Sequence, residues 1–233
     1  MLKVEQIETF NGSSQALFGV RLEERAGEVV TLLGRNGMGK STTIKSIMGL
    51  TPVTRGRITF NDVETQHLPS YQVARQGLGL VPEGRQIFPN LTVLENIMVG
   101  AANRGGRKEP YTLDEVLEIF PRLAERLKNY GNQLSGGEQQ MLAVVRALMT
   151  TPKLLILDEA TEGLAPLVRK EIWYGLSVLK ARGQSILVID KNLDALMKLA
   201  DRHYVMERGA VVWSGETDAI ADNEELKARY LGV

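Results

Sequence analysis

Hydrophobic residues in this chain gather in short runs separated by polar and glycine-containing stretches. Runs of strand length that are rich in valine, isoleucine and leucine occur at Glu28–Leu33, Gly79–Val81, Leu154–Leu157, Ser185–Ile189 and Tyr204–Met206. Several of these runs are continuously apolar, a pattern typical of strands that are covered by helices on both faces of a parallel sheet. The pattern therefore predicts an α/β fold with a mostly parallel core.

Polar and apolar residues alternate more regularly before this core. The segments Leu2–Ile7 and Leu17–Leu22 alternate, and Gly56–Phe60 adds a further short strand. Alternation with a period of two is typical of strands that bury one face. We therefore expect an N-terminal antiparallel β subdomain that flanks the parallel core.

The stretch from about 91 to 150 lacks a convincing strand and has helical spacing instead. Its apolar residues recur at intervals of one turn, at Leu113, Val116, Leu117, Phe120, Leu123 and Leu127. The segment Asn103–Pro110 holds two glycines, a proline and four charged residues, which predicts an exposed loop. The sequence thus predicts an inserted helical subdomain at about 91–150.

Length and composition narrow the classes of function. At 233 residues the chain is long enough for one sizeable core and too short for two ordinary domains, so we expect a single domain over residues 1–233. The 28 basic and 28 acidic residues cancel, so no net field would draw the chain to nucleic acid. The absence of cysteine excludes disulfides and thiolate metal sites.

The chain also lacks the usual signals for export or membrane insertion. Charges at Lys3, Glu5 and Glu8 argue against a signal peptide, so we expect the mature chain to begin at Met1. No run of about 18 apolar residues occurs that could span a bilayer. If the function is transport, the pore therefore belongs to other chains.

A phosphate-binding loop is indicated between the strand Glu28–Leu33 and a helix expected to begin near Lys40. The segment Gly34-Arg-Asn-Gly-Met-Gly-Lys-Ser41 matches G-x-x-x-x-G-K-[ST] in that context, which makes a chance glycine-rich turn a weak alternative. Lys40 would reach the terminal phosphates of a nucleotide, and Ser41 would bind Mg²⁺. The nucleotide-binding candidates are Gly34, Arg35, Asn36, Gly37, Met38, Gly39, Lys40, Ser41 and Thr42.

An acidic pair follows a second apolar strand. In Leu154-Leu-Ile-Leu-Asp158-Glu159, the strand delivers two carboxylates to its C-terminal end, where open α/β sheets bind ligands. A solvated strand end is the alternative, because acidic residues are common there. The preceding heptapeptide Leu134-Ser-Gly-Gly-Glu-Gln-Gln140 weakens that alternative.

This heptapeptide is suited to recognition rather than to catalysis. Ser135, Gly136 and Gly137 are expected to lie just before a helix from about Glu138 to Met149, where a hydroxyl and free backbone N–H groups could face an anion. Ser135 could also act simply as the N-cap of that helix, and both roles are compatible.

Together these motifs resemble the nucleotide-binding subunit of ATP-binding cassette (ABC) transporters, which are P-loop NTPases. The resemblance implies ATP and Mg²⁺ as cofactors, with Ser41 and Asp158 at the metal and Glu159 polarising the attacking water. It implies that Ser135, Gly136, Gly137 and Glu138 contact the γ-phosphate held by an opposite subunit. The segment Ala160–Pro166 resembles the loop along the dimer seam.

Three positions are more specific to this chain. Phe10 stands where the family stacks an aromatic ring on adenine, although it could instead cover the edge of the N-terminal sheet. Glu83 replaces the glutamine that contacts the metal and the membrane partner in many family members, so it is a further candidate for nucleotide and metal binding. Lys191 replaces a histidine that contacts the γ-phosphate, and it is a catalytic candidate alongside Lys40 and Glu159.

The resemblance is narrower than the whole family. VPEGRQIFPNLTVLEN, LSGGEQQMLA, DEATEGLAP and the ending YLGV resemble the second ATPase subunit of branched-chain amino acid importers. That implies a peripheral position on the cytoplasmic face of the inner (plasma) membrane. It also implies a second, different ATPase subunit, two permease subunits and an extracytoplasmic solute-binding protein as partners; a homodimer is plausible in isolation. Ile87, Phe88 and Leu91 would contact the permease, or serve as ordinary subdomain core.

Other functions fit less well. Relatives of the importers handle amides such as urea, or aromatic acids, and nothing in this chain would touch the solute. A soluble ABC ATPase acting on nucleic acid or ribosomes would need a basic stripe, a coiled-coil insertion or a second cassette. A P-loop kinase or GTPase would need an acceptor site or a base-specific motif in place of LSGGEQQ.

Overall fold

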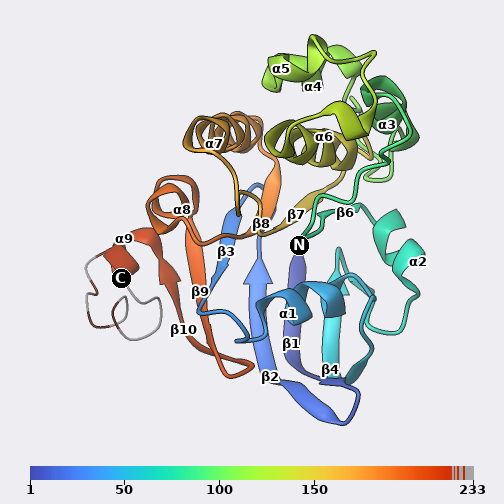
Figure 1. The fold of residues 1–233 in the computed structure, drawn as a ribbon. Helices are drawn as coiled ribbons and strands as arrows, with labels where there is room; N and C mark the ends of the chain where they lie inside the picture. Colours follow the sequence, from blue (N-terminus) through green and yellow to red (C-terminus); the bar gives the residue numbers. More distant parts are fainter. Residues whose placement is uncertain (222, 224, 226–227, 229–233) are drawn as a thin grey trace.

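A six-stranded sheet forms the centre of the molecule. The computed structural model describes residues 1–221, 223, 225 and 228 (Figure 1), so the ending Tyr230–Val233 lies outside the described residues. The strand order is β10-β9-β3-β8-β7-β6, and every neighbouring pair is parallel except β9 and β10. The strands are β3 (Val29–Leu33), β6 (Leu78–Val81), β7 (Leu154–Asp158), β8 (Ser185–Ile189), β9 (Arg202–Glu207) and β10 (Ala210–Glu216). The prediction of a mostly parallel core is confirmed, and the antiparallel edge strand β10 is an addition to it.

Both faces of this sheet are buried, as the continuous apolar runs predicted. Along β7, Leu155 and Leu157 belong to one hydrophobic cluster with the long helices, while Leu154 and Ile156 belong to another with the N-terminal strands. All five residues of β7 are buried. The sheet therefore separates two apolar layers, and Thr31 on β3 and His203 on β9 form a buried polar pair within it.

The N-terminal strands form a separate antiparallel sheet of order β2-β1-β4-β5. Its strands are β1 (Leu2–Asn11), β2 (Ser14–Glu24), β4 (Val53–Phe60) and β5 (Val63–Glu64), so the expected flanking sheet is confirmed with longer strands. Strand β1 pairs with β2 as far as Asn11, with register shifts along its length. The strands β4 and β5 are joined by Asn61 and Asp62, both at positive φ, as a tight hairpin requires.

Helices cover the two faces of the central sheet unequally (Figure 1). Helix α1 (Lys40–Ile47) contacts β1, β2 and β7, so it lies between the two sheets, and α2 (Ser70–Arg75) packs beside β6. Helices α7 (Pro166–Ala181) and α8 (Leu193–Leu199) contribute to the cluster on the opposite face, and α9 (Thr217–Ala221) follows β10. No helix in the described part of the chain is both long and apolar enough to cross a membrane.

Between residues 91 and 150 the chain is helical. It contains α3 (Val93–Val99), α4 (Leu113–Ile119), α5 (Pro121–Ala124), the 3₁₀ turn η1 (Gly131–Gln133) and α6 (Gly136–Leu148). The helical spacing from Leu113 to Leu127 is interrupted at Phe120, where φ is −126°, because Pro121 excludes the α conformation at the preceding residue. The loop at Asn103–Pro110 is mostly exposed, apart from the buried Gly105.

Each of the longer helices in this segment begins with its own cap. Thr92, Thr112 and Ser135 accept a hydrogen bond from the backbone N–H three residues later, and the glutamate at that position reaches back to the cap. Such boxes satisfy N–H groups that the helix itself leaves open.

Candidate functional site

The phosphate loop connects the end of β3 to the start of α1. Gly34 has φ 135°, and a Cβ there would lie 2.4 Å from the Met206 carbonyl oxygen on β9. Gly39 has φ 100°, and a Cβ there would lie 2.9 Å from a Leu17 methyl group. Both positions therefore require glycine, because the loop turns tightly against the strands beneath it.

Lys40 folds back over this loop. Its Nζ donates to the carbonyl oxygens of Gly34 at 2.7 Å and Arg35 at 2.9 Å. Burial lowers the pKa of Lys40, while the carboxylates of Glu159 and Asp158 act in the opposite direction. The ammonium group is thus held at the loop within the influence of both acidic residues.

A cavity of about 600 Å³ opens beside the loop. Its lining combines Asn11, Gln15, Ala16 and Phe18 of the N-terminal sheet, Asn36, Gly37, Gly39, Lys40, Ser41 and Thr42 of the loop and α1, and Glu159, Arg208 and Gly209. A second cavity of about 300 Å³ also includes Lys40, and it is lined by Leu33, Gly34, Arg35, Asn36, Lys40, Glu159, Ile189, Asp190, Lys191 and Leu193. The structure therefore brings most of the predicted phosphate-loop residues together with Glu159 and Lys191.

Two aromatic residues lie at the N-terminal edge of this site. Phe10 is 39% exposed at the end of β1, next to Asn11, but it does not itself line the larger cavity. Phe18 on β2 does line it and is 49% exposed. Sequence reasoning did not single out Phe18, although an exposed phenylalanine in an alternating strand is a signal that could have identified it. Met38 fixes the loop from this side, because its carbonyl oxygen accepts from Gly209 N at 3.0 Å.

The candidate metal ligands meet at the C-terminal end of β7. Ser41 Oγ on α1 donates to Asp158 Oδ1 at 3.0 Å. Burial raises the pKa of Asp158, the Ser41 hydrogen bond lowers it, and the negative charge of Glu83 raises it further. Glu83 is exposed on the loop after β6 and lies within electrostatic reach of Asp158.

These oxygen ligands fit a magnesium–nucleotide complex. Among the described residues, no group of three or more His, Cys, Asp or Glu side chains could hold a metal ion alone. Mg²⁺ commonly binds one or two protein oxygen ligands and completes its shell with phosphate and water. A neighbouring hydroxyl and carboxylate beside a phosphate loop are such a partial ligand set.

Glu159 is held in an unusual backbone conformation directly after β7. Its φ is 57°, and its backbone N–H donates to the Ile189 carbonyl oxygen at 2.9 Å. A hydrogen bond with Glu162, followed by burial and the Glu162 charge, raises the pKa of Glu159 to about 7. The surrounding structure therefore holds the backbone of Glu159 in the left-handed region. Such backbone conformations and shifted pKa values are frequent at functional sites.

Lys191 connects to the same carboxyl group through Glu162. Lys191 Nζ donates to Glu162 Oε1 in an ion pair. The preceding residue, Asp190, accepts from both the backbone N–H and the hydroxyl of Thr161 at 2.7 Å. The loop after β8 is thereby tied to the segment after Glu159. Sequence reasoning missed Glu162 because its partner lies 29 residues further along the chain.

The LSGGEQQ segment begins α6 rather than preceding it. The helix starts at Gly136, two residues before the expected start at Glu138, so Gly136 and Gly137 form its first turn. Ser135 is the N-cap, as predicted: Glu138 N donates to Ser135 Oγ at 3.3 Å, and Ser135 N donates to Glu138 Oε2 at 2.8 Å. The other Glu138 oxygen accepts from Arg126 at 3.3 Å, so this carboxylate is engaged within the chain.

Gly137 explains why glycine stands in this turn. A Cβ at Gly137 would lie 2.3 Å from Val168 Cγ1 on α7, so the Val168 side chain packs directly on the backbone of α6. Neither cavity lined by Lys40 includes a residue of 134–140. Ser135 is exposed and lies outside the cavities around the chain's own phosphate loop.

Comparisons with known proteins agree with this geometry. The ABC transporter family matches residues 17–162. The chain is 40% identical over 232 residues to the high-affinity branched-chain amino acid transport ATP-binding protein BraG of Pseudomonas aeruginosa, covering all of both chains. It is 31% identical to the lipopolysaccharide export system ATP-binding protein LptB of Haemophilus influenzae, covering all of this chain and 97% of that protein.

Solved structures show the same architecture. A dimeric structure of MJ0796, a bacterial ABC transporter cassette, matches with a TM-score of 0.79 and 25% identity, covering 93% of this chain and 99% of that one. The family match covers both the phosphate loop and the acidic pair. The chain therefore belongs to the ABC transporter family, as an ATP-binding cassette of the ATP-hydrolysing type.

Proposed function

We propose that this chain is the ATP-hydrolysing subunit of a membrane importer for branched-chain or other amino acids. The proposed class of solute is supported by the full-length 40% identity to BraG. Importers of urea, other amides or aromatic acids remain alternatives within the same group, because no residue of a nucleotide-binding subunit contacts the solute. Export is a second candidate, favoured by the 31% identity to LptB over nearly the full length of both chains.

In the proposed reaction, water attacks the γ-phosphorus of ATP, the bond to the β–γ bridging oxygen breaks, and ADP and inorganic phosphate leave. Lys40 and the N–H groups of the loop hold the terminal phosphates, and Glu159 orients the water and takes up its proton. A bound Mg²⁺ supplies charge neutralisation on the phosphate oxygens. Ser41 and Asp158 would hold this ion, with Glu83 nearby.

The remaining candidates act around this centre. Phe10 stacks on the adenine, and Lys191 supplies positive charge toward the γ-phosphate once it leaves Glu162. Both roles follow from the family resemblance, and the presence of Lys191 in the cavity that contains Lys40 and Glu159 supports the second. The position of Phe18 in the larger cavity offers a second aromatic surface for the base.

A complete site requires a second subunit. The capped start of α6, with Ser135, Gly136, Gly137 and Glu138, would close on the ATP held by an opposing cassette. The support is that Ser135 is exposed and lies outside both cavities around Lys40. In the importer the partner is a different ATPase subunit, and in isolation the chain forms a homodimer. The dimeric MJ0796 cassette is a structural precedent for such pairing.

Permease contact would occur on the helical segment of about 91–150, which we propose moves as a subdomain within the single domain 1–233. Phe88 before α3 is 45% exposed, and Leu94, Met98 and Val99 on α3 are 38%, 50% and 60% exposed. This exposed apolar surface supports docking to permease subunits on the cytoplasmic face of the inner membrane. The proposed assembly contains two permease subunits and a solute-binding protein outside the membrane. Ile87 packs against the core and contributes less to that surface.

A sizing experiment tests the proposal at its centre. The Glu159→Gln variant should form a stable dimer with ATP and Mg²⁺, because binding survives while water activation is lost. Glu118→Gln, an exposed glutamate on α4, is the matched control and should remain monomeric after ATP turnover. Only monomers of Glu159→Gln at saturating ATP would refute the paired-cassette mechanism. Isolation of the native complex would then identify the permease and the solute-binding protein.

A further inference from the structure

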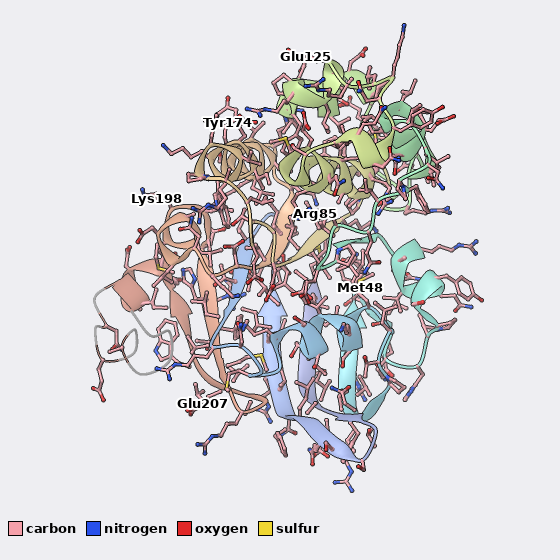
Figure 2. All side chains as sticks on the ribbon, in the orientation of Figure 1. Met48, Arg85, Glu125, Tyr174, Lys198 and Glu207 are labelled. Carbon is pink, nitrogen blue, oxygen red and sulfur yellow. The ribbon has the colours of Figure 1, made fainter. Side chains whose placement is uncertain are left out.

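The loop between β6 and α3 contains three successive residues in the left-handed region. Gly84 has φ 78°, Arg85 has φ 65° and Gln86 has φ 47°. A non-glycine residue in this region costs on the order of 1 kcal/mol or more, so Arg85 and Gln86 must be held by contacts elsewhere. The loop begins at Glu83 beside the acidic pair, and Figure 2 labels Arg85 in the region between β6 and α6.

One set of contacts comes from the last turn of α6. Arg146 Nη2 donates to the Gln86 carbonyl oxygen at 2.6 Å, and the Arg146 guanidinium lies 5.0 Å from the centre of the Phe88 ring. Asn96 on α3 fixes the same phenylalanine, because Phe88 N donates to Asn96 Oδ1 at 2.8 Å and Asn96 Nδ2 donates to Phe88 O at 2.9 Å. The strained loop is thus fastened to the C-terminal end of α6.

The other contact runs in the opposite direction, from the loop to the first turn of α6. Arg85 Nη1 donates to Gln139 Oε1 at 3.4 Å, and a Cβ on Gly136 would lie 2.8 Å from Arg85 Nη1 and 2.9 Å from Nη2. The guanidinium therefore lies on the backbone of Gly136. Gln139 in turn donates to the carbonyl oxygens of Gly131 and Leu134 at 3.2 and 3.3 Å.

Local electrostatics does not account for the position of Arg85. Its guanidinium forms no ion pair with a carboxylate among the described residues. The N-terminal end of a helix carries partial positive charge, which disfavours a cation by about 0.3–1 kcal/mol. The contact is therefore better explained by its geometry, since it joins the loop to the one turn of α6 that the proposed partner nucleotide would meet.

We propose that Arg85 is a positioning residue which, together with Arg146, clamps the loop 83–88 to both ends of α6. The clamp makes the loop and the 13-residue helix move as one body. A displacement of Glu83 on binding of the chain's own nucleotide would then reorient Ser135 toward the nucleotide of the partner. This inference rests on the proposed function, because it assumes that α6 completes a site on an opposing subunit.

The test uses Arg85→Ala, Arg85→Lys and Arg146→Lys, with Arg75→Ala as the matched control. Arg75 is an exposed arginine on α2 whose guanidinium lies 5.5 Å from the centre of the Tyr71 ring, and it lines neither cavity around Lys40. Arg85 is partly exposed, so its removal leaves the core intact. Three quantities are measured: the Kd of ATP for the isolated subunit, the kcat and KM of ATP hydrolysis, and the ATP-dependent dimer in a Glu159→Gln background.

We expect Arg85→Ala to leave Kd and KM within about twofold and to lower kcat and the dimer association constant by about five- to tenfold, in the usual range for coupled sites. Arg146→Lys should likewise lower kcat and the dimer association constant while leaving Kd and KM nearly unchanged. A lysine cannot both donate to Gln86 and stack broadly on Phe88. Arg85→Lys should recover little of the lost kcat, because a lysine keeps the positive charge but lacks the planar, forked guanidinium group. Unchanged kcat in Arg85→Ala, or full recovery in Arg85→Lys, would overturn the clamp.

The two proposals fail differently. If wild type and Arg75→Ala bind no ATP, or if Glu159→Gln never dimerises, the paired-cassette function itself is wrong. If those proteins hydrolyse ATP and dimerise normally while Arg85→Ala matches them, only the clamp is wrong. A general loss of ATP affinity in Arg85→Ala would also overturn the clamp, because it would place Arg85 in the chain's own nucleotide site.

Discussion

His203 offers a quantitative test of how the central sheet is built beneath the phosphate loop. Its side chain is fully buried on β9, paired in register with Thr31 on β3. Nδ1 lies 2.7 Å from Thr31 Oγ1, and Nε2 lies 2.9 Å from Thr217 Oγ1, which itself donates to the Ala200 carbonyl oxygen at 2.6 Å. A neutral imidazole that carries its proton on Nε2 satisfies all of these groups.

Burial lowers the pKa of His203 from 6.5 to about 4, although the Asp201 charge opposes part of that effect. Between these two values the unfolded chain binds a proton that the folded chain does not, so stability rises with pH in this window. The full effect is about 3 kcal/mol, at about 1.36 kcal/mol for each pH unit. Between pH 7.5 and pH 5 the folded state should therefore lose about 2 kcal/mol through this residue alone.

The assay is urea unfolding at pH values from 5 to 7.5, with wild type compared to His203→Gln. Glutamine keeps hydrogen-bonding capacity and cannot take up a proton, so other titrating groups cancel in the difference between the two proteins. The difference in unfolding free energy should shrink by about 2 kcal/mol as the pH falls from 7.5 to 5. Parallel curves across this range would show that the pKa of His203 is not depressed in the folded state.

Other substitutions test the site and the helix contact. Lys40→Ala should weaken ATP binding by about 10- to 100-fold, because hydrogen bonds to a charged group contribute about 1.5–3 kcal/mol; undiminished affinity in calorimetric titration would count against its phosphate role. Lys191→Ala should lower the ATPase rate of the complete transporter by about one order of magnitude or less, and an unchanged rate would assign Lys191 to the surface. Gly137→Ala should destabilise the fold by about 1–3 kcal/mol through overpacking against Val168, as measured by urea unfolding; failure of an added Val168→Ala to restore stability would contradict that cause.

The sequence pattern predicted the central sheet because its signal is local. In a strand, the four consecutive apolar residues Leu154–Leu157 point to both faces of the sheet, so both faces must be buried. The structure extends that strand to Asp158. The edge strand β10 escaped notice because Val212 and its neighbours alternate in exposure and resemble a surface segment. The start of α6 was placed two residues late, since Gly136 and Gly137 are poor helix formers that here are held by a cap and by α7.

Contacts between distant segments could not be predicted in the same way. Phosphate-loop residues and the acidic pair carry motifs, whereas Glu162 matters through its contacts with Glu159 and Lys191. Arg85 lies in one of the stretches that resemble the importer subunits, but its contact with Gly136 depends on three left-handed residues in one loop. The roles of Glu162 and Arg85 depend on contacts between distant segments, and local sequence patterns do not reveal such contacts.

The capping boxes at Thr92, Thr112 and Ser135 have a mechanical consequence. Each uses a side chain from its own helix to close the open N–H groups, and borrows nothing from the central sheet. Tilting these helices as a group would therefore uncover no helix start to solvent and break no cap. Such a movement would leave the caps intact, and it would be opposed by apolar packing and by side-chain links such as Arg122–Glu171 and Tyr111–Gln184.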